Sequence, residues 1–92
     1  VAKAALAGLT RSLARELAPD VRVNAVAPGP ILWPEGDESF DEVSRQRIIS
    51  HTPLKREGTP DDIARAVHFL LADAPYVTGE TISVDGGRGI AM

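Results

Sequence analysis

One stretch decides the fold: Val21-Arg22-Val23-Asn24-Ala25-Val26-Ala27-Pro28-Gly29. Its apolar residues predict a short strand, which ends at Pro28-Gly29-Pro30 because proline lacks the N–H group that a sheet ladder needs. A strand that is apolar on both faces is typical of a parallel sheet covered by helices on both sides. We therefore expect helices before and after this strand.

The predicted helix before the strand covers residues 1–18. Apolar side chains recur on one face at the spacing of a core-facing stripe, namely Ala2, Leu6, Leu9, Leu13 and Leu17. The opposite face carries mostly small residues, namely Ala4, Ala7, Gly8, Arg11, Ala14 and Ala18. Because small side chains allow close approach, we expect this helix to be packed on both sides. It begins without an N-cap, so we also expect the polypeptide to extend upstream.

Two further helices are predicted after the strand. Ser39 and Glu42 form a capping-box pattern for a helix that continues to about residue 51. Thr59, Pro60 and Asp62 give a stronger start signal, because they supply an N-cap, a proline in the first turn and an acidic side chain. The predicted buried face of this last helix is Ile63, Val67, Leu70 and Leu71, with His68 and Phe69 outside it.

A second strand is predicted at residues 81–84, closed by the turn Asp85-Gly86-Gly87. Helix, strand, helices and strand in this order are typical of parallel strands joined by a crossover helix. The predicted fold class is therefore α/β, the C-terminal part of a Rossmann-like doubly wound parallel sheet with two strands and about three helices present. Two strands alone cannot form such a sheet, so its other strands are expected upstream.

Composition narrows the choice of partners. The 92 residues include 10 Lys and Arg against 13 Asp and Glu, and no cysteine. A net charge of -3 disfavours binding to nucleic acid or to an anionic membrane. The lack of cysteine excludes disulfides and cysteine metal sites, and no apolar run approaches the roughly 20 residues of a membrane span. We expect a cytoplasmic protein without nucleic-acid or membrane partners.

Three polar residues are interpreted as structural. His51 and His68 have no partner at metal-ligand spacing, so no metal site is predicted. Asn24 is interpreted as a strand residue that hydrogen-bonds to neighbouring backbone.

Several segments, in this order, resemble the C-terminal third of a short-chain dehydrogenase/reductase. They are residues 1–6, 13–17, 21–29, 59–64, 76–81 and 84–87. Agreement of many segments in order and spacing is more specific than any one of them. The resemblance implies that residues 1–92 are the C-terminal part of one domain whose N-terminal cofactor-binding part is absent from this sequence.

The resemblance assigns roles to four residues. Lys3 matches the catalytic lysine, which follows a tyrosine by four positions; that tyrosine would lie two positions upstream of Val1. In the family the tyrosine protonates the substrate, and the lysine lowers its pKa and binds the nicotinamide ribose. The turn at Pro28 and Gly29 lines the nicotinamide, and the main chain at Ile31 contacts its carboxamide.

The loop after Gly29 covers the substrate in relatives. Residues 28–35 resemble bacterial pteridine reductases, which implies NADPH as cofactor and a dihydropteridine or dihydrofolate as substrate. The substrate-binding residues implied are Pro30, Leu32 and Trp33. The indole of Trp33 either lies beside the flat heterocycle or anchors the loop, and both roles stay open.

Two alternatives accompany this reading. One is a carbonyl reductase of the same family, such as a 3-oxoacyl-carrier-protein reductase. The other is an inactive fragment or interaction module, because the nucleotide-binding glycine loop and the catalytic serine and tyrosine are not among these residues. The resemblance also implies a homotetramer, assembled through the helix at 1–18 and through a second interface with Phe69, the last strand and the tail at 88–92.

Overall fold

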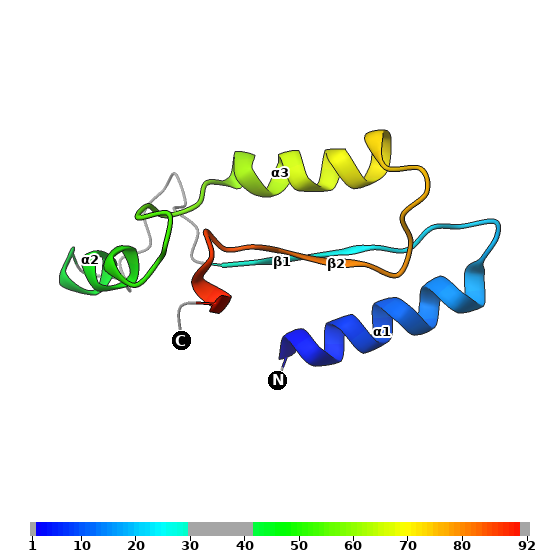
Figure 1. Cartoon of the computed structure of the whole chain (residues 1–92), viewed down its shortest axis with the longest axis horizontal. Coiled ribbons are helices and arrows are strands. Elements are labelled where there is room, and N and C mark those ends of the chain that lie inside the picture. The colour runs from blue at the N-terminus through cyan, green and yellow to red at the C-terminus, as the bar shows by residue number, and fades with distance from the viewer. Residues whose placement is uncertain (1, 30–41, 91–92) are drawn as a thin grey trace.

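The computed structural model describes residues 2–29 and 42–90 of the chain. In order, the elements are helix α1 (Ala2–Leu17), strand β1 (Ala25–Pro28), helices α2 (Glu42–Ser50) and α3 (Pro60–His68), the π-helical turn η1 (Phe69–Asp73), strand β2 (Thr81–Val84) and the 3-10 turn η2 (Arg88–Ile90). Helix α3 covers one face of the two strands and α1 lies on the other face, with α2 beyond their end (Figure 1). This layered arrangement confirms the predicted α/β fold class.

The two strands are parallel and directly paired. Ala25 lies opposite Thr81, and the register runs to Pro28 opposite Val84. The first strand begins four residues later than the sequence suggested. Val23 does not join the ladder, because its N–H donates to the Thr78 hydroxyl at 3.0 Å and its carbonyl accepts from the Gly79 N–H at 2.7 Å. Val23 and Asn24 therefore bond to residues 77–80, which precede β2, rather than to β2 itself.

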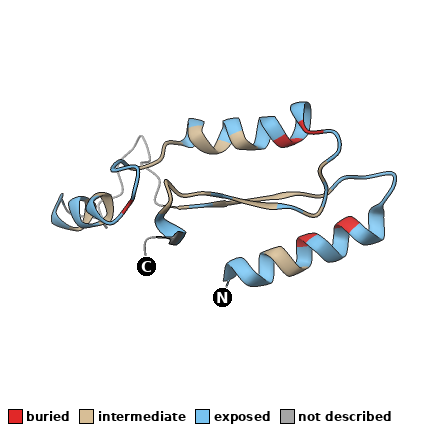
Figure 2. Cartoon of the chain, in the orientation of Figure 1, coloured by how far each residue is buried: buried red, intermediate tan, exposed pale blue. Residues whose placement is uncertain are grey.

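Helix α1 packs on the strands through its small-residue face. Thr10 is 3% exposed and Ala14 is 5% exposed, whereas Leu9 is 58% exposed (Figure 2). A Cβ built on Gly79 would lie 3.5 Å from the Ala14 Cβ, so small side chains are what permit this approach. The exposed leucines of α1 are Leu6, Leu9, Leu13 and Leu17. The predicted close packing of the small-residue face is thus confirmed at Ala14, whereas the leucine stripe does not face the core formed by the described residues.

Helix α3 starts where its capping signal placed it. The Asp62 N–H donates to the Thr59 hydroxyl at 3.2 Å, and the Thr59 N–H donates to the Asp62 carboxylate at 2.8 Å. The predicted buried face is confirmed at Leu70, which is buried, and at Ile63, which is half-buried. It is wrong at Val67, which is 39% exposed, and at Leu71, which is 72% exposed. The helix widens into a π turn from Phe69 onward, and the wider turn moves later side chains off the helical stripe.

The guanidinium of Arg22 caps the C-terminal end of the α3–η1 helix. Its Nη1 donates to the carbonyls of Leu70 at 2.9 Å, Ala74 at 3.0 Å and Val77 at 3.3 Å. Its Nη2 donates to the Leu71 carbonyl at 3.2 Å. The last carbonyls of a helix have no partner inside it, and a cation there also suits the helix dipole. Arg22 thus fastens the segment before β1 to the C-terminal end of the α3–η1 helix.

Asn24 continues the same connection. Its Nδ2 donates to the Val77 carbonyl at 3.0 Å, and its Oδ1 accepts from the Glu80 N–H at 3.0 Å. The predicted hydrogen bonds of Asn24 to neighbouring backbone are confirmed, although Asn24 precedes β1 instead of belonging to it. Because Glu80 immediately precedes β2, this amide helps to set the register between the strands.

The hydrophobic core of the described residues is thin. Its buried apolar side chains are Ala14, Leu70 and Ala74. Across residues 2–29 and 42–90, no helix has both the length and the apolar character required to cross a membrane.

Replacing Arg22 by methionine tests how much the Arg22 cap contributes to stability. We expect Arg22→Met to lower the free energy of unfolding by about 1.5 to 3 kcal/mol, because four carbonyls lose a charged donor. Urea unfolding followed by circular dichroism measures the change. The matched control is Arg11→Met, since Arg11 is exposed and has no hydrogen bond or ion pair with the described residues. Equal losses in both variants would contradict the role given to Arg22.

Candidate functional site

A cavity of about 500 Å³ lies where β1 ends, between the start of α1 and η2. It is lined by Lys3, Ala27, Pro28, Gly29, Asp85, Arg88 and Gly89. Parallel strands of α/β sheets bind ligands at their carboxyl ends, and this volume is within the range of small-molecule sites. The fold therefore brings Lys3, Pro28 and Gly29 together from separate elements. We call this space the Lys3 cavity.

Lys3 reaches the cavity from the first turn of α1. Its Nζ donates a hydrogen bond to the hydroxyl of Ser83 on β2. An ammonium carries three N–H donors, and the described residues supply no carboxylate partner for this one. Two donors of Lys3 therefore remain for a ligand.

Gly29 is required by the backbone beside it. A Cβ at this position would lie 2.6 Å from the Asp85 Cβ and 2.8 Å from its Cα. The Gly29 N–H also donates to the Val84 carbonyl at 2.9 Å, which holds the two strand ends together. The sequence suggested that glycine leaves room for a flat ring. The structure shows a second reason, since any side chain would separate β1 from the turn after β2.

Asp85 organises the turn that follows β2. Its Oδ1 accepts from the Gly87 N–H at 2.9 Å and its Oδ2 from the Gly89 N–H at 3.2 Å. Gly86 has φ of +63°, a left-handed conformation that glycine adopts readily. The predicted turn is confirmed, and it fixes the backbone of Arg88 at the rim of the Lys3 cavity.

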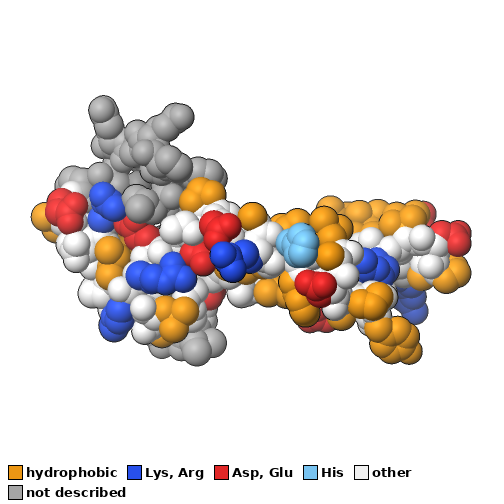
Figure 3. Space-filling model, turned by 90° about the horizontal axis from the view of Figure 1, so that it is seen from above, with side chains coloured by type: hydrophobic (Ala, Val, Ile, Leu, Met, Phe, Trp, Pro, Cys, Tyr) orange, Lys and Arg blue, Asp and Glu red, His pale blue; other side chains and the backbone are white. Residues whose placement is uncertain are grey.

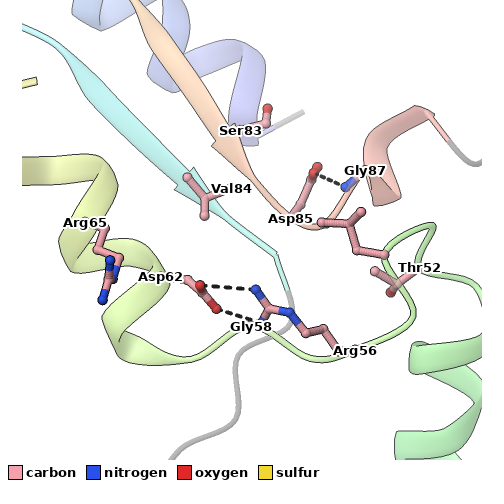
Figure 4. A pocket seen from close by; sticks show the side chains of 11 residues that line it. Thr52, Arg56, Gly58, Asp62, Arg65, Ser83, Val84, Asp85 and Gly87 are labelled. Atoms are coloured by element: carbon pink, nitrogen blue, oxygen red, sulfur yellow. Dashed lines mark hydrogen bonds and ion pairs between the residues drawn. The ribbon is translucent and has the colours of Figure 1, made fainter. Parts of the chain in front are cut away.

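A second cavity, of about 410 Å³, shares Asp85 with the first and extends toward α3 (Figure 4). Here the charged groups face each other. Arg56 Nη1 lies 2.9 Å and Nη2 3.3 Å from the two carboxylate oxygens of Asp62. Arg65 pairs with Asp61 at 2.6 Å. Because each cation already has an acidic partner, we interpret the ion pairs around this cavity as stabilising the fold rather than binding a ligand.

The Asp62 carboxyl is strongly held in its charged form. The hydrogen bonds from Arg56, followed by the one from the Thr59 N–H, keep the pKa of Asp62 well below its usual range. The same pair raises the pKa of Arg56. The start of α3 is therefore tied to the loop before it by a paired charge.

Four predicted site residues, Pro30, Ile31, Leu32 and Trp33, lie outside the described residues. The sequence patterns predict no site role for Arg88 and place it only in the tail of an interface. Its position directly after a turn at the carboxyl end of a parallel strand is the signal that could have identified it.

A protein-family model described as enoyl-(acyl carrier protein) reductase matches residues 1–88. Among curated proteins, the chain is 45% identical over 87 residues to the 3-oxoacyl-(acyl-carrier-protein) reductase FabG of Thermotoga maritima, covering 92% of this chain and 35% of the relative. It is 44% identical over 86 residues to dihydromonapterin reductase of Klebsiella pneumoniae, covering 94% of this chain and 34% of the relative.

Solved structures agree with these matches. A short-chain dehydrogenase/reductase from Brucella melitensis, described as a glucose/ribitol dehydrogenase, superposes with a TM-score of 0.82 at 45% identity, over 92% of this chain and 35% of that one. A 4-hydroxyisoleucine dehydrogenase complexed with NADH superposes with a TM-score of 0.84 at 34% identity, over 94% and 37%. The chain spans about a third of the length of the relatives it matches.

Substituting Gly29 tests the close approach to Asp85. We expect Gly29→Ala to lower the free energy of unfolding by about 1 to 3 kcal/mol, because the added Cβ overlaps backbone atoms. Gly8→Ala is the control, since nothing lies within 4 Å of a Cβ there. That variant should gain about 0.5 to 1 kcal/mol from better helix propensity. Thermal and urea unfolding compare the two, and a neutral Gly29→Ala would refute the steric argument.

The Arg56–Asp62 pair predicts a pH dependence. A lowered pKa in the folded state gives stability that is present above the ordinary aspartate pKa of about 3.9 and is lost as pH falls below it. We expect the free energy of unfolding of Asp62→Asn to fall less steeply from pH 5 to pH 2 than that of the wild type, as measured by urea unfolding.

Asp61→Asn is the matched control for Asp62→Asn. It removes a neighbouring charge whose ion pair is exposed, with side chains 69% and 80% accessible, so it should retain more of the wild-type slope. Equal flattening in the two variants would count against a specific role for Asp62.

Proposed function

Because the chain belongs to the short-chain dehydrogenase/reductase family, we propose that it is the C-terminal third of an NADPH-dependent reductase. The proposed reaction transfers a hydride to a C=N bond of a pterin, either a dihydropteridine or dihydrofolate. The observation that carries this proposal is the meeting of Lys3, Pro28 and Gly29 in one cavity at the strand ends. Doubly wound sheets bind nucleotide cofactors at this edge.

The Lys3 cavity fits the nicotinamide end of such a cofactor. Ala27, Pro28, Gly29 and Gly89 give it small walls that leave space for a flat ring. The free donors of Lys3 would hold the ribose hydroxyls, and the main chain at Ile31 would bind the carboxamide. When bound, NADPH supplies the hydride. The remaining part of the dinucleotide would bind to the N-terminal part of the domain that we propose precedes these residues.

Lys3 would also prepare the proton donor. In the proposed full-length enzyme a tyrosine lies one helical turn before Lys3, on the same face of α1. The ammonium favours the phenolate and so lowers the pKa of that tyrosine. The proton then leaves the phenol more easily and moves to the pterin nitrogen beside the reduced carbon.

The pterin assignment rests on the loop after Gly29. Residues 28–35 resemble bacterial pteridine reductases, and a dihydromonapterin reductase is 44% identical to this chain. Pro30, Leu32 and Trp33 are the proposed substrate contacts. Offset stacking of an indole on a flat heterocycle contributes roughly 0.5 to 1.5 kcal/mol beyond burial.

A second candidate is a carbonyl reductase that acts on 3-oxoacyl thioesters. FabG of Thermotoga maritima matches nearly the same residues at 45% identity, one percentage point above the dihydromonapterin reductase. Both candidates use the same Lys3 cavity and differ in the loop that follows Gly29.

We also propose that the enzyme is a homotetramer. The leucine stripe of α1 is exposed, and on the α3 side Phe69 is 49% and Leu71 72% exposed. Figure 3 shows apolar side chains gathered on that side. The same exposed surfaces favour the alternative of an interaction module, whose apolar faces would bind another protein.

The substrate and Lys3 are tested together in the full-length enzyme that contains residues 1–92. We expect reduction of dihydrobiopterin or dihydrofolate with NADPH, and little reduction of acetoacetyl thioesters. Lys3→Ala should lower kcat/KM by about 10² to 10⁴, because the proton donor loses its neighbouring cation. Absorbance of NADPH follows the reaction, and circular dichroism checks the fold.

Arg15→Ala is the control for Lys3→Ala, since Arg15 is an exposed basic residue of the same helix. Turnover of the thioester alone would replace the pterin reading by the carbonyl reductase. Wild-type rates in Lys3→Ala would remove Lys3 from the mechanism. An enzyme inactive on both substrates would favour the interaction module.

A further inference from the structure

Arg88 lines the Lys3 cavity, and its side chain has no partner among the described residues. It is the first residue of η2 and is exposed. Within residues 2–29 and 42–90, its guanidinium makes no hydrogen bond and no ion pair. Arg22 and Arg56, by contrast, have their guanidinium groups bonded to carbonyls or to a carboxylate.

The backbone of Arg88 is held while its side chain is not. The Arg88 N–H donates to the Asp85 carbonyl at 3.1 Å. The flanking residues Gly87 and Gly89 both donate to the Asp85 carboxylate. The turn therefore presents Arg88 from a fixed base at the rim of the cavity, which reduces the ordering cost when its side chain binds a ligand.

The charges around the cavity do not balance. Among the described residues of the lining, Lys3 and Arg88 contribute two cations and Asp85 contributes one acidic side chain. Both oxygens of Asp85 already accept backbone N–H groups. The neighbouring cavity differs, because there Arg56 and Arg65 each have an aspartate partner. The excess positive charge of the Lys3 cavity thus favours an anionic ligand.

We propose that Arg88 binds an anionic group, a carboxylate or a phosphate, of a molecule held in the Lys3 cavity. The planar guanidinium presents paired N–H donors that match both anions in a bidentate manner. This inference rests on the proposed reductase function, because it takes the cavity to be the reaction site. The anion belongs either to the substrate, which makes Arg88 a specificity residue, or to the cofactor.

Charged and neutral substrates of the same class separate these sources. Dihydrofolate carries carboxylates that dihydrobiopterin lacks, and acetoacetyl-CoA carries phosphates that acetoacetyl-N-acetylcysteamine lacks. For whichever pair the full-length enzyme reduces, we expect Arg88→Gln to lower the charged-to-neutral ratio of kcat/KM by about 10- to 100-fold. Arg88→Lys should give a smaller loss, because it keeps the charge but not the planar fork.

The dissociation constant of NADPH, measured by fluorescence titration, tests the other source. An unchanged substrate ratio with a tenfold weaker NADPH complex in Arg88→Gln would assign the anion to the cofactor, in agreement with the proposal. An unchanged ratio and an unchanged dissociation constant would overturn it.

Arg11→Gln serves as the control and should alter neither quantity. Because two substrate classes are assayed, the Arg88 inference can succeed on the thioester pair even if the pterin assignment fails. With turnover of neither class, the dissociation constants of the charged and neutral ligands, titrated alongside NADPH, take the place of the kcat/KM ratio in the same comparison.

Discussion

The bonds from Arg22 to four backbone carbonyls are the constraint on which the described structure depends. They join the segment before β1 to the C-terminal end of the α3–η1 helix. Asn24 extends the connection to Glu80, the residue before β2. Since β1 and β2 pair over four residues each, a slip at this end would shift every later pair. The strand ends that line the Lys3 cavity are therefore positioned from the opposite end of the sheet.

The sequence predicted what depends on local chemistry. The cap at Thr59 and the strand at residues 81–84 have signals within a few residues of each other, and both were found where expected. The role of Arg22 could not be predicted in this way, because its carbonyl partners lie 48 to 55 residues further along the chain. For α1 the sequence predicts packing on both faces. The small-residue face packs at Ala14 against the Gly79 turn, whereas hydrophobicity alone does not show that the leucines face away from the described core.

The two cavities at the strand ends show how similar residues acquire different roles. In the cavity next to α3, Arg56 and Asp62 form a bidentate pair that is part of the cap of α3. A pair of this kind satisfies both charges and leaves little for a ligand. In the Lys3 cavity the acid, Asp85, is occupied by the turn that it builds. The cations Lys3 and Arg88 therefore remain available to a ligand. The two cavities differ in whether their cations are paired with described acidic side chains, and not in the types of residue that line them.

The exposed apolar side chains of the helices indicate where other surfaces would pack. The buried apolar residues among those described are Ala14, Leu70 and Ala74, whereas Leu9 and Leu71 are more than half exposed. Apolar side chains on both helices thus need partner surfaces that these residues do not supply to one another. The chain also spans about a third of its relatives, and its strands supply one edge of a cavity. Leu71 lies at the end of the α3–η1 helix that Arg22 bonds, whereas Lys3 lies where β1 ends, so covering this leucine and completing the Lys3 cavity would require different surfaces.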